Sequence, residues 1–262
     1  MEPPDQLERV ILMCAGRGER WGDHRGAPKH LVEVDGEALL DRTVRMVRAR
    51  TGAEVVIVAF DKAYERAGCV RHVPAHGPEH FCDADKFLSS RELWGRSGQT
   101  VLLYGDVFFT EKALDAILEF RGEYQFFGRR EGSYYTGRAW RELFAISFSP
   151  AGAEPLRACM EAVKVEQATG RQGNCGGWRV YERLHGSSGQ RFTVIDDFTD
   201  DFDYPEDYER WLRHYRSRVH RLLVPLYGRA IKSWRWRLYR WRRRLLGGGA
   251  EGAATRTGAE DV

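Results

Sequence analysis

The chain has 262 residues, 42% of them hydrophobic, and a formal net charge of +3, which predicts a globular protein with one main domain. No apolar run reaches the roughly 18 residues that would span a bilayer, and the first residues lack the pattern of a signal peptide, so we expect a cytoplasmic protein. The five cysteines are scattered, which argues against a disulfide framework or a zinc site and predicts reduced thiols.

Charge is distributed unevenly along the chain. Residues 213–244 hold twelve Lys or Arg and no acid, whereas residues 1–212 hold 28 basic and 35 acidic groups, a net charge of −7. An acidic body repels nucleic acid, so the basic balance of the whole chain does not indicate a nucleic-acid-binding protein.

Seven apolar segments rich in β-branched and aromatic residues predict strands. They cover residues 9–15, 53–60, 69–73, 100–106, 124–128, 143–148 and 191–196. Several are apolar throughout, as strands covered on both faces must be. Because helical patterns lie between them, we expect an α/β fold, in which crossover helices cover both faces of a mostly parallel sheet.

Two stripes of apolar residues predict crossover helices. One stripe comprises Leu40, Val44 and Val47, and the other comprises Leu114, Ile117 and Leu118 after the helix-start candidate Thr110. The polar and glycine-rich segments 129–142 and 170–190 are predicted to be loops that help to enclose a second substrate.

A glycine-rich stretch, "CAGRGERWGDHRGAPKHL", follows the first strand. Glycine lets the backbone approach a ligand closely and wrap around phosphate oxygens. The spacing of Gly16, Gly18 and Gly22 fits neither the Walker pattern nor the dinucleotide-binding pattern.

This stretch and the residues after it resemble the signature of nucleotidyltransferases with a GT-A-like fold, a group that includes sugar-1-phosphate nucleotidyltransferases and MobA-like enzymes. The signature has an apolar strand, A-G-x-G-x-R, P-K-x-L, a short spacer with glycine, and a helix that opens with L-L. Its counterparts here are Ala15-Gly16-Arg17-Gly18-Glu19-Arg20, Pro28-Lys29-His30-Leu31, Val34-Asp35-Gly36 and Leu39-Leu40-Asp41-Arg42-Thr43.

The resemblance implies roles for the basic residues, and the charge of a triphosphate supports them. Arg20 resembles the arginine that grips the β- and γ-phosphates, and Lys29 the lysine that neutralises charge around the α-phosphate. The backbone of Ala15, Gly16 and Gly18 would line the nucleotide. Ser89 and Ser90 occupy the place where the family contacts the base, although ordinary helix surface is an equal alternative for both.

Nucleotidyl transfer normally needs Mg²⁺, which binds hard oxygen ligands such as carboxylates. Asp106 follows an apolar strand in a G-D context where the family places a metal ligand. The segment "DDFDYPED" resembles the D-x-D-x-P-E-D end of the family's catalytic domain, which makes Asp203 the second metal candidate and Asp201 the third. Pro205 would then begin a helix.

These features predict an enzyme that moves a nucleoside monophosphate from an NTP to a phosphorylated small-molecule acceptor, with release of pyrophosphate and without a covalent intermediate. One alternative is a GT-A glycosyltransferase that uses a sugar nucleotide, although Arg20 and Lys29 have no use there and Asp106 starts no D-x-D. Another is a non-catalytic nucleotide-binding regulator. Acceptor contacts are expected from Arg129, Arg130, Tyr134, Tyr135, Asn174 and Trp178.

The predicted organisation is a catalytic domain over residues 1–212, a basic amphipathic helix over 213–246 and a disordered tail over 247–262. In the helix, Tyr227, Ile231, Trp234, Leu238, Trp241 and Leu245 recur at helical spacing with arginines on the other face. Segment 225–246 is expected to contact an anionic membrane surface at the inner face of the membrane, the acidic body of the chain itself, or a second copy of the chain.

Overall fold

The computed structural model describes residues 6–217, apart from residues 17, 23, 76, 78–81, 171–175 and 187. The chain divides into two compact units, Met1–Arg213 and His214–Val262. The predicted amphipathic helix and tail therefore lie almost wholly outside the described residues, as does Asn174, and these stay predictions. Within the described ranges, every helix is too short or too polar to cross a membrane.

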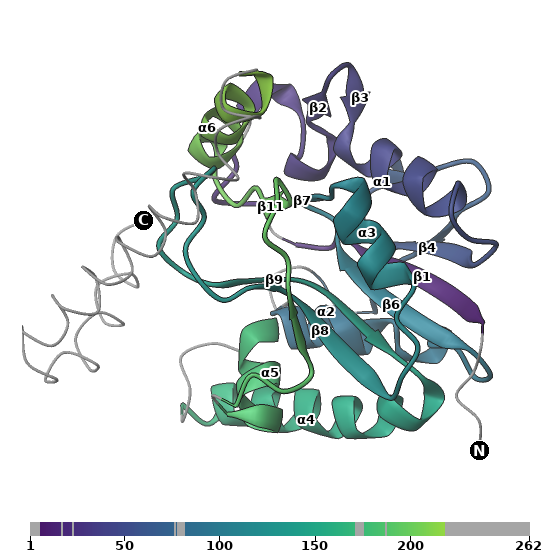
Figure 1. The fold of residues 1–262 in the computed structure, drawn as a ribbon. Coiled ribbons are helices and arrows are strands. Elements are labelled where there is room, and N and C mark those ends of the chain that lie inside the picture. The colour runs from purple at the N-terminus through teal and green to yellow at the C-terminus, as the bar shows by residue number, and fades with distance from the viewer. Residues whose placement is uncertain are drawn as a thin grey trace, which may run out of the picture. The chain divides into compact units, whose positions relative to one another are not determined.

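A seven-stranded sheet forms the centre of the first unit, in the order β10-β8-β9-β6-β1-β4-β5 (Figure 1). All strand pairs are parallel except those of β9 with β6 and β8. All seven predicted strands are present, and the predicted mostly parallel sheet is confirmed. The strands are β1 Leu7–Met13, β4 Glu54–Val58, β5 Val70–His72, β6 Gln99–Tyr104, β8 Tyr124–Arg129, β9 Glu142–Phe148 and β10 Phe192–Val194.

Helices cover both faces of this sheet (Figure 1). In β1, Val10 and Leu12 belong to one buried core and Ile11 and Met13 to the other, because successive side chains of a strand point to opposite faces. The first core includes α1 Leu39–Arg48 and α3 Glu111–Leu118, whose predicted apolar stripes are buried there. The second core includes α2 Asp83–Ser89, α4 Pro150–Ala168 and α5 Gly177–His185.

Helix α5 corrects the prediction of a loop over 170–190. Residues 177–185 are helical, and Val180 and Tyr181 are buried in the second core. The glycines before Trp178 suggested an open loop. The apolar face of the helix outweighs this local signal because it packs on the sheet.

The start of each of two predicted helices is confirmed. The Thr110 side chain accepts a hydrogen bond from the Ala113 N–H and so caps α3. Helix α6, Pro205–Arg216, begins at the predicted proline.

Two short antiparallel pairs flank the main sheet. Strands β2 Glu33–Val34 and β3 Glu37–Ala38 form a tight hairpin. Strands β7 Val107–Phe108 and β11 Asp200–Asp201 join segments that are far apart in sequence. The second pair places residues 196–207, called the late acidic segment below, beside the end of β6.

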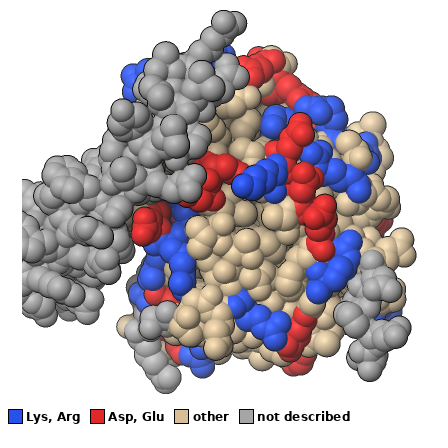
Figure 2. Space-filling view, viewed as in Figure 1, with Lys and Arg blue, Asp and Glu red and all other residues tan. Residues whose placement is uncertain are grey.

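Charged side chains on the face seen in Figure 2 are mixed, with Lys and Arg interspersed among Asp and Glu around a central area without charge. Several of the described arginines are ion-paired, such as Arg45 with Glu37 at 2.7 Å and Arg50 with Asp115 at 2.5 Å. On this face the basic groups do not merge into one continuous surface.

The prediction that all cysteines are reduced is wrong for Cys82, which is disulfide-bonded. Cys14, Cys69 and Cys159 are free thiols, as expected. Sequence spacing gave no signal for the bond, since no C-x-x-C pattern is present.

The cap of α3 leads to a stability prediction. Thr110 Oγ1 also donates to Asp197, so Thr110→Ala loses the cap and a contact with the late acidic segment. We expect a loss of about 1–2 kcal/mol in the free energy of unfolding, measured by urea denaturation. Thr110→Ser, which keeps the hydroxyl, is the matched control, and equal losses in both variants would contradict the capping role.

Candidate active site

A cleft of about 260 Å³ opens where the chain leaves β1 and β6. Ligands in open α/β sheets bind at this carboxyl edge of the strands. Seven of the ten predicted site residues line the cleft: Ala15, Gly16, Gly18, Arg20, Lys29, Asp106 and Asp203. Lys86 and Tyr104 also line it and were not predicted.

The glycine-rich loop forms one wall of the cleft. Gly18 has a φ of +66°, in the left-handed region that favours glycine, and its carbonyl accepts hydrogen bonds from the N–H groups of Trp21 and Gly22. Buried Trp21 fastens the loop further on, because its indole N–H donates to the Ala27 carbonyl at 2.9 Å. The loop is thus tied back on itself, and its glycine backbone faces the cleft.

Lys29 stands at the centre of the site. It begins the short 3-10 helix Lys29–Leu31, directly after Pro28. Its Nζ forms an ion pair with Asp106 and lies 3.2 Å from Oδ1 of Asp203. A single ammonium group therefore connects the two carboxylates that the sequence predicts as metal ligands.

Arg20 is the second cation of the site. Its guanidinium lies 2.9 Å from Oδ2 of Asp203 and 5.3 Å from the centre of the Tyr204 ring. The Arg20 side chain is 57% exposed, compared with 14% for Lys29. Arg20 can therefore reach toward solvent, whereas Lys29 is held between its partners.

Backbone pairing brings Asp203 to this place. The Phe202 N–H donates to the Asp106 carbonyl at 3.1 Å, directly beyond the β7 and β11 pair. The side chain of Asp203 then lies beside Lys29, although 174 positions separate the two in sequence.

The central ion pairs fix the charges of their members. Burial opposes ionisation of Asp106, but Lys29 outweighs it and lowers the pKa of Asp106 to about 2. Burial likewise opposes the charge on Lys29, but Asp106 and Asp203 raise its pKa above the ordinary value. Both groups are ionised at neutral pH.

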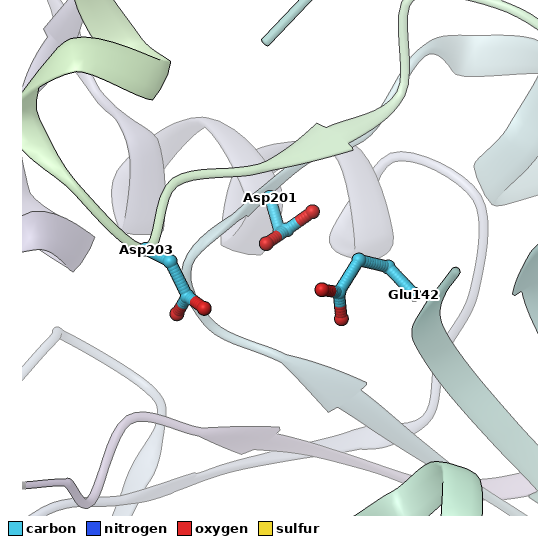
Figure 3. A group of neighbouring side chains, drawn as sticks. All are labelled: Glu142, Asp201 and Asp203. Carbon is cyan, nitrogen blue, oxygen red and sulfur yellow. The ribbon is translucent and has the colours of Figure 1, made fainter. Parts of the chain in front are cut away.

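A second group of acids borders the first. Glu142, Asp201 and Asp203 each offer an oxygen, and these oxygens lie within 4.8 Å of one another (Figure 3). Glu142 was not predicted, and only the direction of its strand could have indicated it. Glu142 is the first residue of β9, which runs antiparallel to its neighbours. The amino end of β9 therefore lies at the same edge of the sheet as the carboxyl ends of the parallel strands.

Carboxyl groups outnumber cations in this acidic group. Arg129 donates to Asp201 at 2.9 Å and pairs with Asp200 at 3.0 Å. Burial, together with neighbouring carboxylates, nevertheless raises the pKa of Asp201 to about 8 and that of Glu142 well above its ordinary value. Carboxylate oxygens this close are suitable ligands for a hard divalent cation, and Asp203 belongs to both groups.

Residues 10–120 match the family model of the MobA-like NTP transferase domain. Over these residues the chain is similar to a MobA-like NTP transferase domain. The predicted resemblance is confirmed, and so is the prediction of a nucleotidyltransferase at the level of the domain. The matched range includes Arg20, Lys29 and Asp106, whereas Asp203 lies beyond it.

Solved structures share the fold over about four fifths of the chain. The CTP:phosphocholine cytidylyltransferase of Streptococcus pneumoniae has a TM-score of 0.52 and 12% identity, covering 80% of this chain and 100% of that chain. The inositol-1-phosphate CTP transferase of T. maritima has a TM-score of 0.51 and 16% identity, covering 81% and 98%. At these identities the likeness concerns the fold. No curated protein matches the chain.

The two serines that were predicted to contact the base do not line the cleft. Ser90 is fully buried and its hydroxyl donates to the Phe87 carbonyl, while the Ser89 hydroxyl donates to the Lys86 carbonyl. Both hydroxyls are bonded to the backbone of α2 instead of facing a ligand, because such short side chains bond readily to nearby carbonyls.

The predicted acceptor contacts also differ from expectation. Arg129 is buried under the acidic group rather than exposed in a loop. Tyr135 stacks on Phe198, and Arg130 donates to the Tyr181 hydroxyl. None of these three side chains lines the cleft.

Lys86 of α2 and Tyr104 of β6 form another part of the cleft wall, and Asp83 connects them to α5. Asp83 accepts hydrogen bonds from the Tyr104 hydroxyl at 3.1 Å and from the Gly177 N–H at 3.0 Å. It also pairs with Lys86 at 3.1 Å, which holds this third cation of the cleft in place. A Cβ at Gly16 would lie 3.7 Å from the Lys86 ammonium, so the lysine reaches across to the glycine-rich loop.

Buried His30 makes the stability of the domain depend on pH. Burial lowers the pKa of His30 to about 3, against an ordinary value of 6.5, so the folded state keeps the ring neutral while the unfolded state takes up a proton below pH 6.5. Stability therefore falls with falling pH. We expect His30 to account for a loss of about 2 kcal/mol between pH 7 and pH 5.

Urea denaturation of the wild type and of His30→Gln at both pH values measures this loss. The variant should show the smaller dependence on pH. Tyr64→Phe is the control, because it removes only the hydroxyl that lies 2.9 Å from the ring. An identical pH dependence in the wild type and His30→Gln would contradict the prediction.

Proposed function

We propose that this transferase domain moves a nucleoside monophosphate from an NTP to a phosphorylated small-molecule acceptor, releases pyrophosphate and depends on Mg²⁺. The observation that carries the proposal is the convergence of Lys29 and Arg20 on Asp106 and Asp203 in one cleft behind a glycine-rich loop. Cations for phosphates and carboxylates for a metal are the two requirements of this chemistry.

The nucleotide would bind along the glycine-rich loop. The backbone of Ala15, Gly16 and Gly18 would line it. The planar, partly exposed guanidinium of Arg20 suits the β- and γ-phosphates, and buried Lys29 suits the charge that develops around the α-phosphate. Positioning and charge stabilisation would be sufficient for the reaction, without a covalent intermediate.

Asp106 and Asp203 would hold the metal, with Asp201 as a further candidate. Their oxygens are hard ligands from two strand ends, joined by the hydrogen bond between Phe202 and Asp106. When bound, Mg²⁺ would supply positive charge that offsets the charge of the phosphates. Glu142 would offer a further oxygen beside those of Asp201 and Asp203.

A phosphorylated acceptor is proposed because a second phosphate would explain a third cation, Lys86, in the cleft. The names of two proteins with this fold, which refer to phosphocholine and inositol 1-phosphate, are consistent with this class. The direct test is pyrophosphate release with each of four NTPs and a panel that contains phosphocholine, inositol 1-phosphate and glucose 1-phosphate.

The outcome of this screen also separates the alternatives. NTP binding without release of pyrophosphate in the presence of any acceptor would favour a non-catalytic regulator. Transfer of sugar from a sugar nucleotide would favour a glycosyltransferase. Either result would overturn the proposed reaction.

Removal of the central cation should slow the reaction strongly. Lys29→Ala is expected to lower kcat by about 10²–10³, because a preorganised charge next to the reacting phosphate is lost. The measurement is the steady-state rate of pyrophosphate release with the best substrate pair. Lys112→Ala, at an exposed lysine of α3, is the matched control, and a Lys29→Ala rate within a few-fold of wild type would reject the role.

Two acids of the late segment should differ sharply in function. Asp203→Asn is expected to lower turnover by at least about 10²-fold and to raise the Mg²⁺ concentration needed for half-maximal rate, because the site loses a charged ligand. Glu206→Gln changes an exposed acid in the first turn of α6 and should stay within a few-fold of wild type. Similar rates for both variants would remove Asp203 from the proposed metal site.

A further inference from the structure

The two carboxylates proposed to hold the metal are both paired with cations of the chain itself. Lys29 bridges Asp106 and Asp203, and Arg20 pairs with the other oxygen of Asp203. Both carboxylates are largely buried, with 13% and 17% of the side chain exposed. Water therefore competes weakly for the two ion pairs of Lys29, whose side chain is 14% exposed.

The formal charges of these residues indicate how the net charge of the site would change when a divalent cation binds alone or together with a nucleotide. With Lys29, Arg20, Asp106 and Asp203 ionised, two positive and two negative groups balance. A divalent cation alone would leave these four groups and the ion with an excess of two positive charges. A cation that arrives together with the phosphates of a nucleotide would not, because the phosphates supply the missing negative charge.

We propose that Lys29 acts as a resident counter-ion that blocks the metal site until a nucleotide is present. This inference rests on the proposed function, and it adds an order of binding to it. The ammonium of Lys29 lies between the carboxylates, so it must leave them before a divalent cation can bind to both. Phosphate oxygens in the cleft give Lys29 and Arg20 new partners.

The local structure suits such a movement. Lys29 is fixed at its backbone, where Pro28 and the short 3-10 helix hold it, while its long side chain alone needs to swing. His30, next along the chain, is buried against Tyr64 and keeps that backbone in place. Release of the carboxylates therefore requires no change in the fold.

The test is the binding of Mn²⁺ to the full chain without nucleotide, measured by electron paramagnetic resonance of the free ion. We expect Lys29→Met to bind Mn²⁺ at least about tenfold more tightly than the wild type, because the competing ammonium is gone. Lys29→Arg, which keeps the charge, and Lys112→Met, which removes a distant lysine, should bind as weakly as the wild type. Circular dichroism establishes that each variant is folded.

A second pair of variants locates the ion. The gain in Lys29→Met should disappear in the double variant with Asp106→Asn. Lys29→Gln gives the same comparison with a polar side chain if Lys29→Met does not fold. Equal Mn²⁺ affinity in the wild type and both neutral variants would overturn the blocking role of Lys29, and pyrophosphate release would still test the proposed function. A gain that persists with Asp106→Asn would place the metal elsewhere and overturn the blocking role of Lys29, whereas the proposed function would still be decided by pyrophosphate release.

Discussion

The ion pairs of Lys29 with Asp106 and Asp203 are the interaction on which the site depends. Three buried charges in one cleft are unfavourable unless each has a partner, so the segments that carry them must meet. Lys29 follows β1 and the glycine-rich loop, and Asp106 follows β6. Asp203 comes from the last part of the first unit. Their meeting joins the first and last parts of the first unit.

The fold meets this requirement through backbone pairing as much as through charge. The sheet aligns the carboxyl ends of β1 and β6, which places the glycine-rich loop beside Asp106. The small β7 and β11 pair then carries the late segment across to the same edge. Arg129 reinforces this second step, because its buried guanidinium pairs with Asp200 and Asp201 in β11.

An excess of acid beyond Arg129 distinguishes the two halves of the site. Near Lys29 the carboxylates are balanced, and the pKa of Asp106 is low. Near Glu142 they are not, and the pKa of Asp201 is raised to about 8. The first half is thus a balanced set of ion pairs, whereas in the second half crowding and burial favour protonated carboxyl groups.

The sequence by itself determined the seven strands, the α1 and α3 stripes, the cap at Thr110 and the residues of the glycine-rich loop, because periodicity and glycine spacing are local signals. It also predicted that Arg20, Lys29, Asp106 and Asp203 belong to the site, because each stands in a local motif. Only the tertiary structure decided that Glu142 joins the acidic group, that Lys86 faces the loop, and that Ser90 and Arg129 are buried. These outcomes depend on strand direction and on packing between distant segments, which no local pattern records.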